Sequence, residues 1–303
     1  MTPPVGAVGV IGAGAVGQSV ALSLMANGWC REIAVTSGRA TSAQALVADL
    51  EDMQQLLGAP TRPRATCVAQ MHDCAAVVVC PRAKFTNTAT ADVRMAGLTA
   101  NAPLIKALAR ALGGYAGVVV VVTNPVDVMS RLLAEVSGCQ RVYGVGSNTD
   151  TARYRISLAR FLDVPADSVT GHVIGEHGDN AVVCASTTRV DGQPTAVPLE
   201  QVHAELHARP HRINQGIGRA RCGPAGAVLA ALRATLGLMD GVIELCVNTD
   251  GHWRGTPLRF TSGHPTVCLP DLDASEADQL ADADRKLHAA YATITPHHST
   301  QGD

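Results

Sequence analysis

The chain has 303 residues, of which 47% are hydrophobic, so it is long enough to bury a sizeable core and to form two domains. Its formal net charge of −2 gives no general attraction to nucleic acid or to an anionic membrane surface. No apolar run reaches the roughly 18 residues of a membrane span, and the N-terminal residues do not have the pattern of a secretory signal. The chain is therefore expected to bind neither nucleic acid nor membranes and to remain in the cytoplasm.

The nine cysteines are scattered along the chain, and no two of them form a Cys-x-x-Cys pair. Scattered cysteines in a chain of this size are typical of reduced thiols that pack as small apolar groups. The sequence therefore predicts no disulfide framework and no metal site.

Short apolar runs alternate with helical patterns in the first half of the chain. Residues 7–11, 75–79 and 118–122 have the continuous apolar character of strands that are buried on both faces of a parallel sheet. Leucines recur at helical spacing over residues 46–57 and again over 104–112, where Pro103 is expected in the first helical turn. Strands that alternate with helices predict an α/β fold with a doubly wound parallel sheet over residues 1–147.

The pattern changes after residue 147, and we expect a second, α+β domain over residues 148–303 that carries the substrate site. Residues 168–191 are rich in expected strand, and 199–238 are expected to be largely helical with interruptions at Pro210 and at "CGPAG". "VIELCV" and "PTVCLP" predict two antiparallel strands around a polar turn. A last helix is expected to begin at Ser275, and the tail "TITPHHSTQGD" is expected to be disordered.

A glycine-rich turn directly follows the first expected strand. Gly12, Gly14 and Gly17, with Ala15 and Val16 between the last two, form a G-x-G-x-x-G pattern at the start of a helix. One glycine permits the tight turn, the second lets the backbone approach a pyrophosphate, and the third lets helix and strand pack closely. In this strand–turn–helix context the pattern predicts a dinucleotide-binding Rossmann fold, whereas the alternative is a glycine-rich turn without a ligand.

The end of the next expected strand has no acidic residue, although NAD-binding chains place Asp or Glu there to bind the ribose hydroxyls. Ser37, Gly38 and Arg39 stand there instead. Arg39 offers a planar fork of donors that suits phosphate oxygens, and Thr41 or Ser42 can add a hydroxyl. This arrangement favours NADP(H) as the cofactor. The alternative is an exposed loop arginine in a protein that binds NAD less tightly.

Four further segments follow the glycine turn in order: "ADVRMAGLTAN" (91–101), "TNPVD" (123–127), "NTDTARYR" (148–155) and "GEHGD" (175–179). A lone histidine in a glycine-rich turn is more often structural than catalytic. With these segments in this order, however, the chain resembles the lactate/malate dehydrogenase family from about residue 5 to residue 292. The resemblance implies hydride transfer between a nicotinamide and C2 of a 2-oxo or L-2-hydroxy acid, by a homodimer or homotetramer.

The resemblance also assigns roles to five residues. It implies that His177 is the proton donor and acceptor, with a pKa near the working pH, and that Asp150 orients its ring and favours the imidazolium. It implies that Arg153, one helical turn after Asp150, binds the substrate carboxylate with both prongs of its guanidinium. It implies that Arg94 closes over the site and polarises the C2 carbonyl, and that Asn124 bonds near substrate and nicotinamide. The alternative for Asp150 and Arg153 is an ion pair on a helix surface.

The loop "CPRAKFTNTATADV" departs from the family, because it is about three residues too long when counted from its two ends. A cation in this loop favours a dicarboxylate such as oxaloacetate, whereas an uncharged residue favours smaller or apolar side chains. Arg82 and Lys84 each predict malate chemistry, and Phe85 predicts an apolar or aromatic 2-oxo acid. We favour a cation and a malate- or oxaloacetate-like substrate.

A second departure from the family is compatible with a bulkier substrate. Cys222, Gly223, Ala225 and Gly226 stand where the family lines the substrate pocket, and their small size predicts a wide pocket. An NADP preference also fits a biosynthetic reduction better than carbon catabolism.

His203, His207 and His211 are spaced four residues apart. On an unbroken helix they would share one face and form a candidate metal site, but Pro210 is expected to interrupt that helix and no acid or cysteine completes the set. We therefore expect a polar surface helix there.

Two other classes of protein remain as alternatives to a 2-oxo-acid reductase. A related fold hosts NAD-dependent glycosidases, but those need a metal-binding Cys/His arrangement where this chain has His177, Asp150 and Arg153. A protein that senses NADPH without chemistry would not need Arg94 and His177 together.

Overall fold

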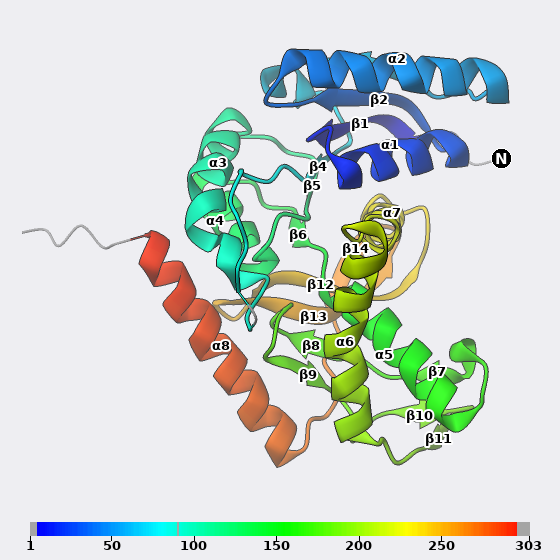
Figure 1. Cartoon of the computed structure of the whole chain (residues 1–303), viewed down its shortest axis with the longest axis vertical. Coiled ribbons are helices and arrows are strands. Elements are labelled where there is room, and N and C mark those ends of the chain that lie inside the picture. The colour runs from blue at the N-terminus through cyan, green and yellow to red at the C-terminus, as the bar shows by residue number, and fades with distance from the viewer. Residues whose placement is uncertain (1–4, 90, 296–303) are drawn as a thin grey trace, which may run out of the picture.

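A computed structural model describes residues 5–89 and 91–295 (Figure 1). In the first half the strands are β1 (Val5–Ile11), β2 (Cys30–Thr36), β3 (Arg62–Ala65), β4 (Ala76–Val79), β5 (Val118–Val121) and β6 (Val142–Gly144). The helices there are α1 (Ala15–Asn27), α2 (Ala40–Leu57), α3 (Leu98–Ala111) and α4 (Val126–Ser137), with short 3-10 turns η1 (Val68–Met71) and η2 (Met95–Gly97).

The six strands of the first half form a parallel sheet in the order β3-β2-β1-β4-β5-β6. The order reverses between β1 and β4, as it does in a doubly wound sheet, so the carboxyl ends of these two strands flank a crevice. The expected α/β fold class is therefore confirmed, and the three expected strands differ from β1, β4 and β5 by at most two residues at either end.

Both faces of this sheet are buried, as the continuous apolar strands predict. In β5, Val118 and Val120 pack into a core with α1, α2 and α7, whereas Val119 and Val121 pack into a second core with α3, α4 and α8. Successive side chains of a strand point to opposite faces, so a run of valines supplies both cores at once.

The second half contains α5 (Ser147–Leu162), the 3-10 turn η3 (Ala166–Ser168), β7 (Val169–Thr170), β8 (Val173–Gly175), β9 (Ala181–Val183), β10 (Arg189–Val190) and β11 (Gln193–Pro194). It continues with α6 (Leu199–Ile217), α7 (Cys222–Thr235), β12 (Gly241–Thr249), β13 (His252–Thr261), β14 (His264–Val267) and α8 (Ala274–Ile294). The large sheet runs on from β6 through β12, β13, β8 and β9, so one sheet joins both halves of the chain.

Three expectations for this half are wrong in detail. The polar turn expected between two strands is the ten-residue strand β13, which pairs with β12 over His252–Phe260 and with β14 on its other side. Pro210 does not interrupt α6, where Val202 is the one buried residue, so a helix that packs so little can accommodate the missing N–H. "CGPAG" forms the first turn of α7 instead of a break.

Two helix starts also differ from expectation. Helix α3 begins at Leu98, so Pro103 lies inside it and not in its first turn. Helix α8 begins at Ala274, because Asp273 accepts a hydrogen bond from the Glu276 amide and forms a capping box. The expected disordered tail is wrong for Thr293 and Ile294, which belong to α8, and from residue 296 onward it lies outside the described residues. In the described ranges, no helix combines the length and apolar character needed to cross a membrane.

Candidate active site

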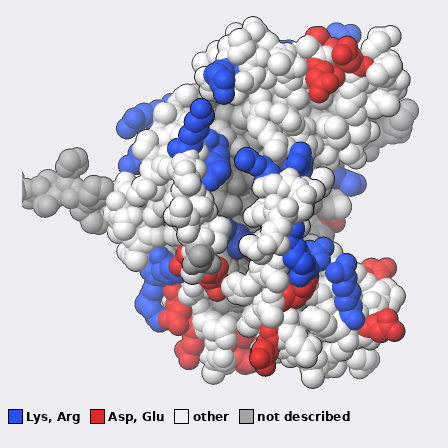
Figure 2. Space-filling model, viewed as in Figure 1, with Lys and Arg blue, Asp and Glu red and all other residues white. Residues whose placement is uncertain are grey.

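A cleft of about 1930 Å³ lies between the carboxyl ends of the parallel strands and the helices α5 and α6. Figure 2 shows lysine and arginine side chains around this hollow, on both of its rims. Its lining includes six cationic side chains and three acidic ones, although the whole chain carries a net charge of −2. The cations are Arg39, Arg82, Lys84, Arg94, Arg153 and Arg219, and the acids are Asp150, Asp179 and Asp282. The cleft therefore favours anionic ligands.

The glycine turn forms one end of the cleft and fits a pyrophosphate. Gly12 has a φ of +115°, which favours glycine, and Gly14 has open space within 4 Å of the position of a Cβ. A Cβ on Gly17 would lie 1.7 Å from the Gly12 carbonyl oxygen, so this residue permits the close packing of α1 on β1. Gly12, Gly14, Ala15 and Val16 line the cleft, where the N-terminus of α1 favours a negative charge, whereas Gly17 packs behind them.

The end of β2 borders the same part of the cleft. Ser37, Gly38, Arg39 and Ser42 all line it, and Arg39 is the exposed residue that precedes the first turn of α2. That first turn contains no acidic residue. A phosphate on the ribose of a bound dinucleotide would therefore meet a guanidinium, two hydroxyls and a helix N-terminus.

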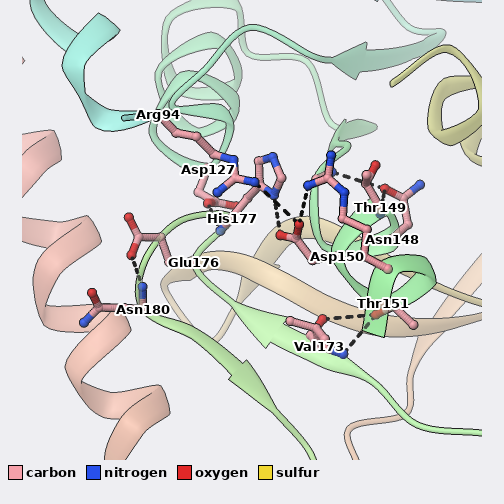
Figure 3. Close-up of polar contacts among 12 residues, drawn as sticks. Arg94, Asp127, Asn148, Thr149, Asp150, Thr151, Val173, Glu176, His177 and Asn180 are labelled. Atoms are coloured by element: carbon pink, nitrogen blue, oxygen red, sulfur yellow. Dashed lines mark hydrogen bonds and ion pairs between the residues drawn. The ribbon is translucent and has the colours of Figure 1, made fainter. Parts of the chain in front are cut away.

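His177 and Asp150 form a buried pair in the cleft, although they lie on different elements. The Nδ1 of His177, in the turn between β8 and β9, lies 2.5 Å from Oδ2 of Asp150, in the first turn of α5 (Figure 3). The His177 ring also packs on Gly146, where a Cβ would lie 2.4 Å from its Cγ. The bond at Nδ1 fixes the ring and leaves Nε2 as the nitrogen that can exchange a proton with a ligand.

The charges around this pair set its protonation. Burial by itself raises the pKa of Asp150, but the charges of His177, Arg94 and Arg153 outweigh it and lower that pKa to about 2. Burial and the charge of Arg94 lower the pKa of His177 below its ordinary value, against the opposing effect of Asp150. Asp150 therefore favours the imidazolium, as the resemblance implies, but burial and the charge of Arg94 outweigh its effect on the pKa of His177.

Two arginines converge on the other oxygen of Asp150. The Nη1 of Arg153 donates to Oδ1 at 3.2 Å, and the Nη2 of Arg94 lies 3.7 Å from the same oxygen. Arg153 is 9% exposed and lines the cleft, so its pair with Asp150 is buried and not the helix-surface pair of the alternative interpretation. The site therefore holds two guanidinium groups and one ionised carboxylate beside a histidine.

Asn124 lies at the carboxyl end of β5 and lines the cleft. Its side-chain Oδ1 is buried and has no hydrogen-bond partner among the described residues, so it is available to a ligand. Its carbonyl oxygen accepts a hydrogen bond from Asn101, whose own Oδ1 accepts one from the amide of Ala83 at 2.9 Å. Asn101 thus fixes the start of the long loop against β5, a role that its place in "ADVRMAGLTAN" did not reveal.

The structure brings all three competing residues of the long loop to the cleft. Arg82 and Lys84 are exposed, whereas Phe85 is half-buried and lies close to Gly97. The guanidinium carbon of Arg82 stacks 4.1 Å from the centre of the Phe85 ring. Phe85 therefore has packing partners on two sides, and the two cations stand nearer to solvent.

The wide pocket expected from small residues in α7 is not found. The cleft is lined there by Gly218, Arg219, Ala220 and Pro224, just before and at the start of the helix. Cys222, Gly223, Ala225 and Gly226 are absent from that lining, and Ala225 packs into the core that α7 shares with α1. Cys222, Gly223 and Gly226 are exposed, with open space beside the two glycines, so these small residues do not enlarge the site.

The histidines of α6 lie on a continuous helix and not on the interrupted one that was expected. Because α6 is continuous, His203, His207 and His211 share a face and line the cleft. Among the described residues, no three His, Cys, Asp or Glu side chains come together as a metal site would need. Helix α6 is the polar surface helix that was expected, with Val202 as its one buried residue, and its three histidines form part of the cleft wall.

Asp127, the last residue of "TNPVD", is a buried acid of the site that the sequence analysis did not single out. Its Oδ2 accepts a hydrogen bond from the His177 amide at 2.8 Å, and its Oδ1 has no partner in the described part of the chain. Burial raises the pKa of Asp127 to about 7, although the His177 amide opposes this shift. An acid two residues after Pro125 was the available signal, but only the fold shows that it lies under the turn that carries His177.

We expect Asp127→Asn to remove a pH dependence from the free energy of unfolding. A raised pKa means that the folded state binds a proton that the unfolded state has lost between about pH 4 and 7, so stability falls as pH rises through this range, by up to about 1.4 kcal/mol per unit. The variant keeps an acceptor for the His177 amide, and its Tm relative to wild type should rise from pH 5 to pH 8. Parallel Tm profiles would contradict this account, and Asp49→Asn, at an exposed site in α2, is the control.

Comparison with known proteins agrees with this geometry. Residues 7–145 match the family described as lactate/malate dehydrogenase, NAD binding domain. The L-lactate dehydrogenase of Treponema denticola is 35% identical over 194 residues, which cover 61% of this chain. These residues span 59% of that protein, which is less than two thirds of its length. The malate dehydrogenase of Haloferax volcanii is 33% identical over 208 residues, which cover 64% of this chain and 68% of that protein.

The fold agrees as well. The crystal structure of the lactate dehydrogenase from Cryptosporidium parvum, complexed with lactic acid and nicotinamide adenine dinucleotide, superposes with a TM-score of 0.86. It covers 98% of this chain and 100% of its own, at 21% identity, so this likeness concerns the fold. The sequence matches show that the chain belongs to the lactate/malate dehydrogenase family and is a nicotinamide-dependent 2-hydroxy-acid dehydrogenase.

Proposed function

We propose that the protein is an NADP(H)-dependent reductase that converts a 2-oxo acid to an L-2-hydroxy acid, with an oxaloacetate-like dicarboxylate as the favoured substrate. The observation that carries the cofactor preference is Arg39 at the rim of the cleft, beside Ser37 and Ser42 and without an acid in the first turn of α2. A carboxylate there would repel a 2′-phosphate, whereas this set attracts one. As a dehydrogenase, the chain is neither the glycosidase nor the non-catalytic sensor that its sequence left as alternatives.

The proposed chemistry assigns one task to each group around Asp150. The bound dinucleotide supplies the hydride for reduction. Arg153 binds the substrate carboxylate, and Arg94 donates hydrogen bonds to the C2 oxygen as negative charge develops there. His177 gives that oxygen a proton from Nε2, while Asp150 holds the ring through Nδ1. An anionic substrate raises the pKa of His177 again, since a nearby negative charge favours the imidazolium.

We expect Arg39→Ala to weaken NADPH binding by about 1–3 kcal/mol, the value of a lost charge-assisted contact, and to leave NADH binding nearly unchanged. Ser37→Asp should shift the preference toward NADH, because it restores the acid that binds the ribose hydroxyls. Fluorescence titration with each cofactor measures both effects. Arg31→Ala, at the exposed start of the same strand, is the matched control. A wild-type protein that prefers NADH, or an Arg39 variant that weakens both cofactors equally, contradicts the proposal.

The dicarboxylate preference is supported by the two exposed cations of the long loop and by Arg219 on the opposite wall. A second carboxylate would enter a cleft in which positive charges already outnumber negative ones. Phe85 packs between Arg82 and the Gly97 region, so it is a weaker candidate for the residue that contacts the substrate side chain and sets the specificity. A bulkier aromatic 2-oxo acid is the second candidate, because Phe85 also lines the cleft.

A comparison of kcat/KM for oxaloacetate, pyruvate and phenylpyruvate separates these substrates. The proposal expects oxaloacetate to be best and the double variant Arg82→Gln/Lys84→Gln to lose that advantage. If oxaloacetate is no better than phenylpyruvate, and the double variant changes nothing, Phe85 becomes the residue to test.

We further propose that residues 1–147 bind the dinucleotide, that residues 148–303 carry most of the substrate site, and that the chain acts in the cytoplasm as a homodimer or homotetramer. The last point is supported by Leu22, Leu56 and Leu57, which are 52%, 85% and 60% exposed on the neighbouring helices α1 and α2. Light scattering after size-exclusion chromatography tests the assembly, and a monomer at micromolar concentration would contradict it.

A further inference from the structure

Lys286 contacts both the long loop and the turn that carries His177, which is called the catalytic turn below. It lies on α8, and its Nζ donates to the carboxylates of Asp92 and Glu176, the latter at 2.9 Å, and to Oδ1 of Asn180 at 3.2 Å. Asp92 ends the long loop, whereas Glu176 and Asn180 flank the turn that carries His177. One lysine from a third element thus connects the loop to the catalytic turn, across 194 residues of sequence.

The catalytic turn depends on this lysine for charge balance. Glu176 is 3% exposed and directly precedes His177, and its Oε2 also accepts a hydrogen bond from the Asn180 amide at 3.0 Å (Figure 3). A buried carboxylate needs a cation, and Lys286 forms its only ion pair within the described ranges. The carboxylates in turn raise the pKa of Lys286 against the effect of its own burial, so it stays charged.

The loop side of the contact is equally well defined. Asp92 has a φ of +47°, and its amide donates to Oδ2 of Asp179 at 2.8 Å. Its carbonyl oxygen accepts hydrogen bonds from the amides of Met95 and Ala96, which open the η2 turn. Arg94 lies between these anchors, so the position of Asp92 sets where the Arg94 guanidinium stands relative to Asp150.

We propose that Lys286 is a positioning residue for the reaction, which holds Arg94 and His177 at a fixed separation by binding Asp92 and Glu176 at once. Lys286 touches neither substrate nor cofactor in this role. The inference rests on the proposed roles of Arg94 and His177, and its effect reaches the chemistry through the geometry of those two side chains.

Two variants test the proposal. Asp92→Asn replaces the ion pair between Lys286 and the loop by a weaker, neutral hydrogen bond and leaves the pair of Lys286 with buried Glu176, so the fold is expected to remain intact. Lys286→Met removes the ion pairs with both Asp92 and Glu176. Each should lower kcat/KM for the 2-oxo acid by about 10- to 100-fold with an unchanged Kd for NADPH, and the double variant should be no worse than Lys286→Met alone. Lys286→Arg should restore much of the activity, because a guanidinium can bind both carboxylates.

Hydrogen–deuterium exchange gives a readout that does not depend on turnover. Without NADPH or substrate, both variants should exchange faster at the amides of Asp92, Met95 and Ala96, with no change in β5. Lys106→Met is the matched control, because Lys106 also binds α8, through the Ile294 carbonyl, but lies away from the loop. Unchanged kcat/KM in both variants, or unchanged exchange at these amides, overturns the proposal. If His177→Asn also retains activity, the proposed function fails and not merely the role of Lys286.

Discussion

His177→Asn is expected to lower kcat by roughly 100-fold or more, because it removes the group that exchanges a proton with the substrate oxygen. Asparagine keeps a polar group beside Asp150, whose Oδ2 lies 2.5 Å from the His177 ring in the wild-type protein. It has no nitrogen that gains and loses a proton near neutral pH. Steady-state oxidation of NADPH with the best 2-oxo acid measures the loss.

The Kd for NADPH should stay the same in this variant, because the glycine turn and Arg39 lie at the other end of the cleft. His172→Asn is the matched control. His172 also donates from Nδ1 to a buried carboxylate, that of Glu244 at 2.6 Å, but it lies outside the cleft. Retained kcat in the His177 variant, or an equal loss in the His172 variant, would refute the assigned role.

Arg153→Lys is expected to lower kcat/KM by about 10- to 100-fold, although it keeps the positive charge. A guanidinium binds a carboxylate through two parallel N–H donors, and an ammonium cannot reproduce that geometry. Arg153 is buried and already bonded to Asp150, so a lysine side chain at this position has little room to move toward the substrate carboxylate. The loss should appear mainly as a raised KM for the 2-oxo acid, with the Kd for NADPH unchanged.

Arg155→Lys provides a control on the same helix. Arg155 bonds to the Gly171 carbonyl at 3.0 Å and lies near Glu244, away from the cleft lining. The two substitutions are chemically identical and two residues apart, so they separate substrate binding from a general effect on α5. Equal kinetics for wild type and the Arg153 variant would mean that another cation anchors the carboxylate.

The sequence by itself determined the features that depend on local pattern. The valine run of β5 predicted a strand buried on both faces, because alternate side chains of one strand must fill two cores. The spacing of Gly12, Gly14 and Gly17 predicted the dinucleotide turn, since each glycine meets a backbone requirement within a few residues. Ser37 and Arg39 could be proposed as cofactor-binding residues from the sequence, because they stand at a fixed distance from that turn.

Only the tertiary structure decided what depends on contacts between distant segments. Strand β13 forms despite its mixed polarity and Pro257, because it pairs with β12 and β14 on its two sides. Pro210 remains inside α6, because this helix packs little of its surface against the rest of the protein. The α6 histidines therefore share one face and line the cleft. Ala225 of α7 packs into the core that this helix shares with α1, a partner that no local pattern identifies.

The same reason explains which site residues were missed. Asp127 and Lys286 contact the turn that carries His177 across 50 and 110 residues of sequence, respectively. An acid after a proline and a lysine in an exposed-looking amphipathic helix have no local signature of function. Their roles follow from burial and from the charges that the fold places beside them, because the free energy of a buried charge depends on its neighbours in space and not on its neighbours in sequence.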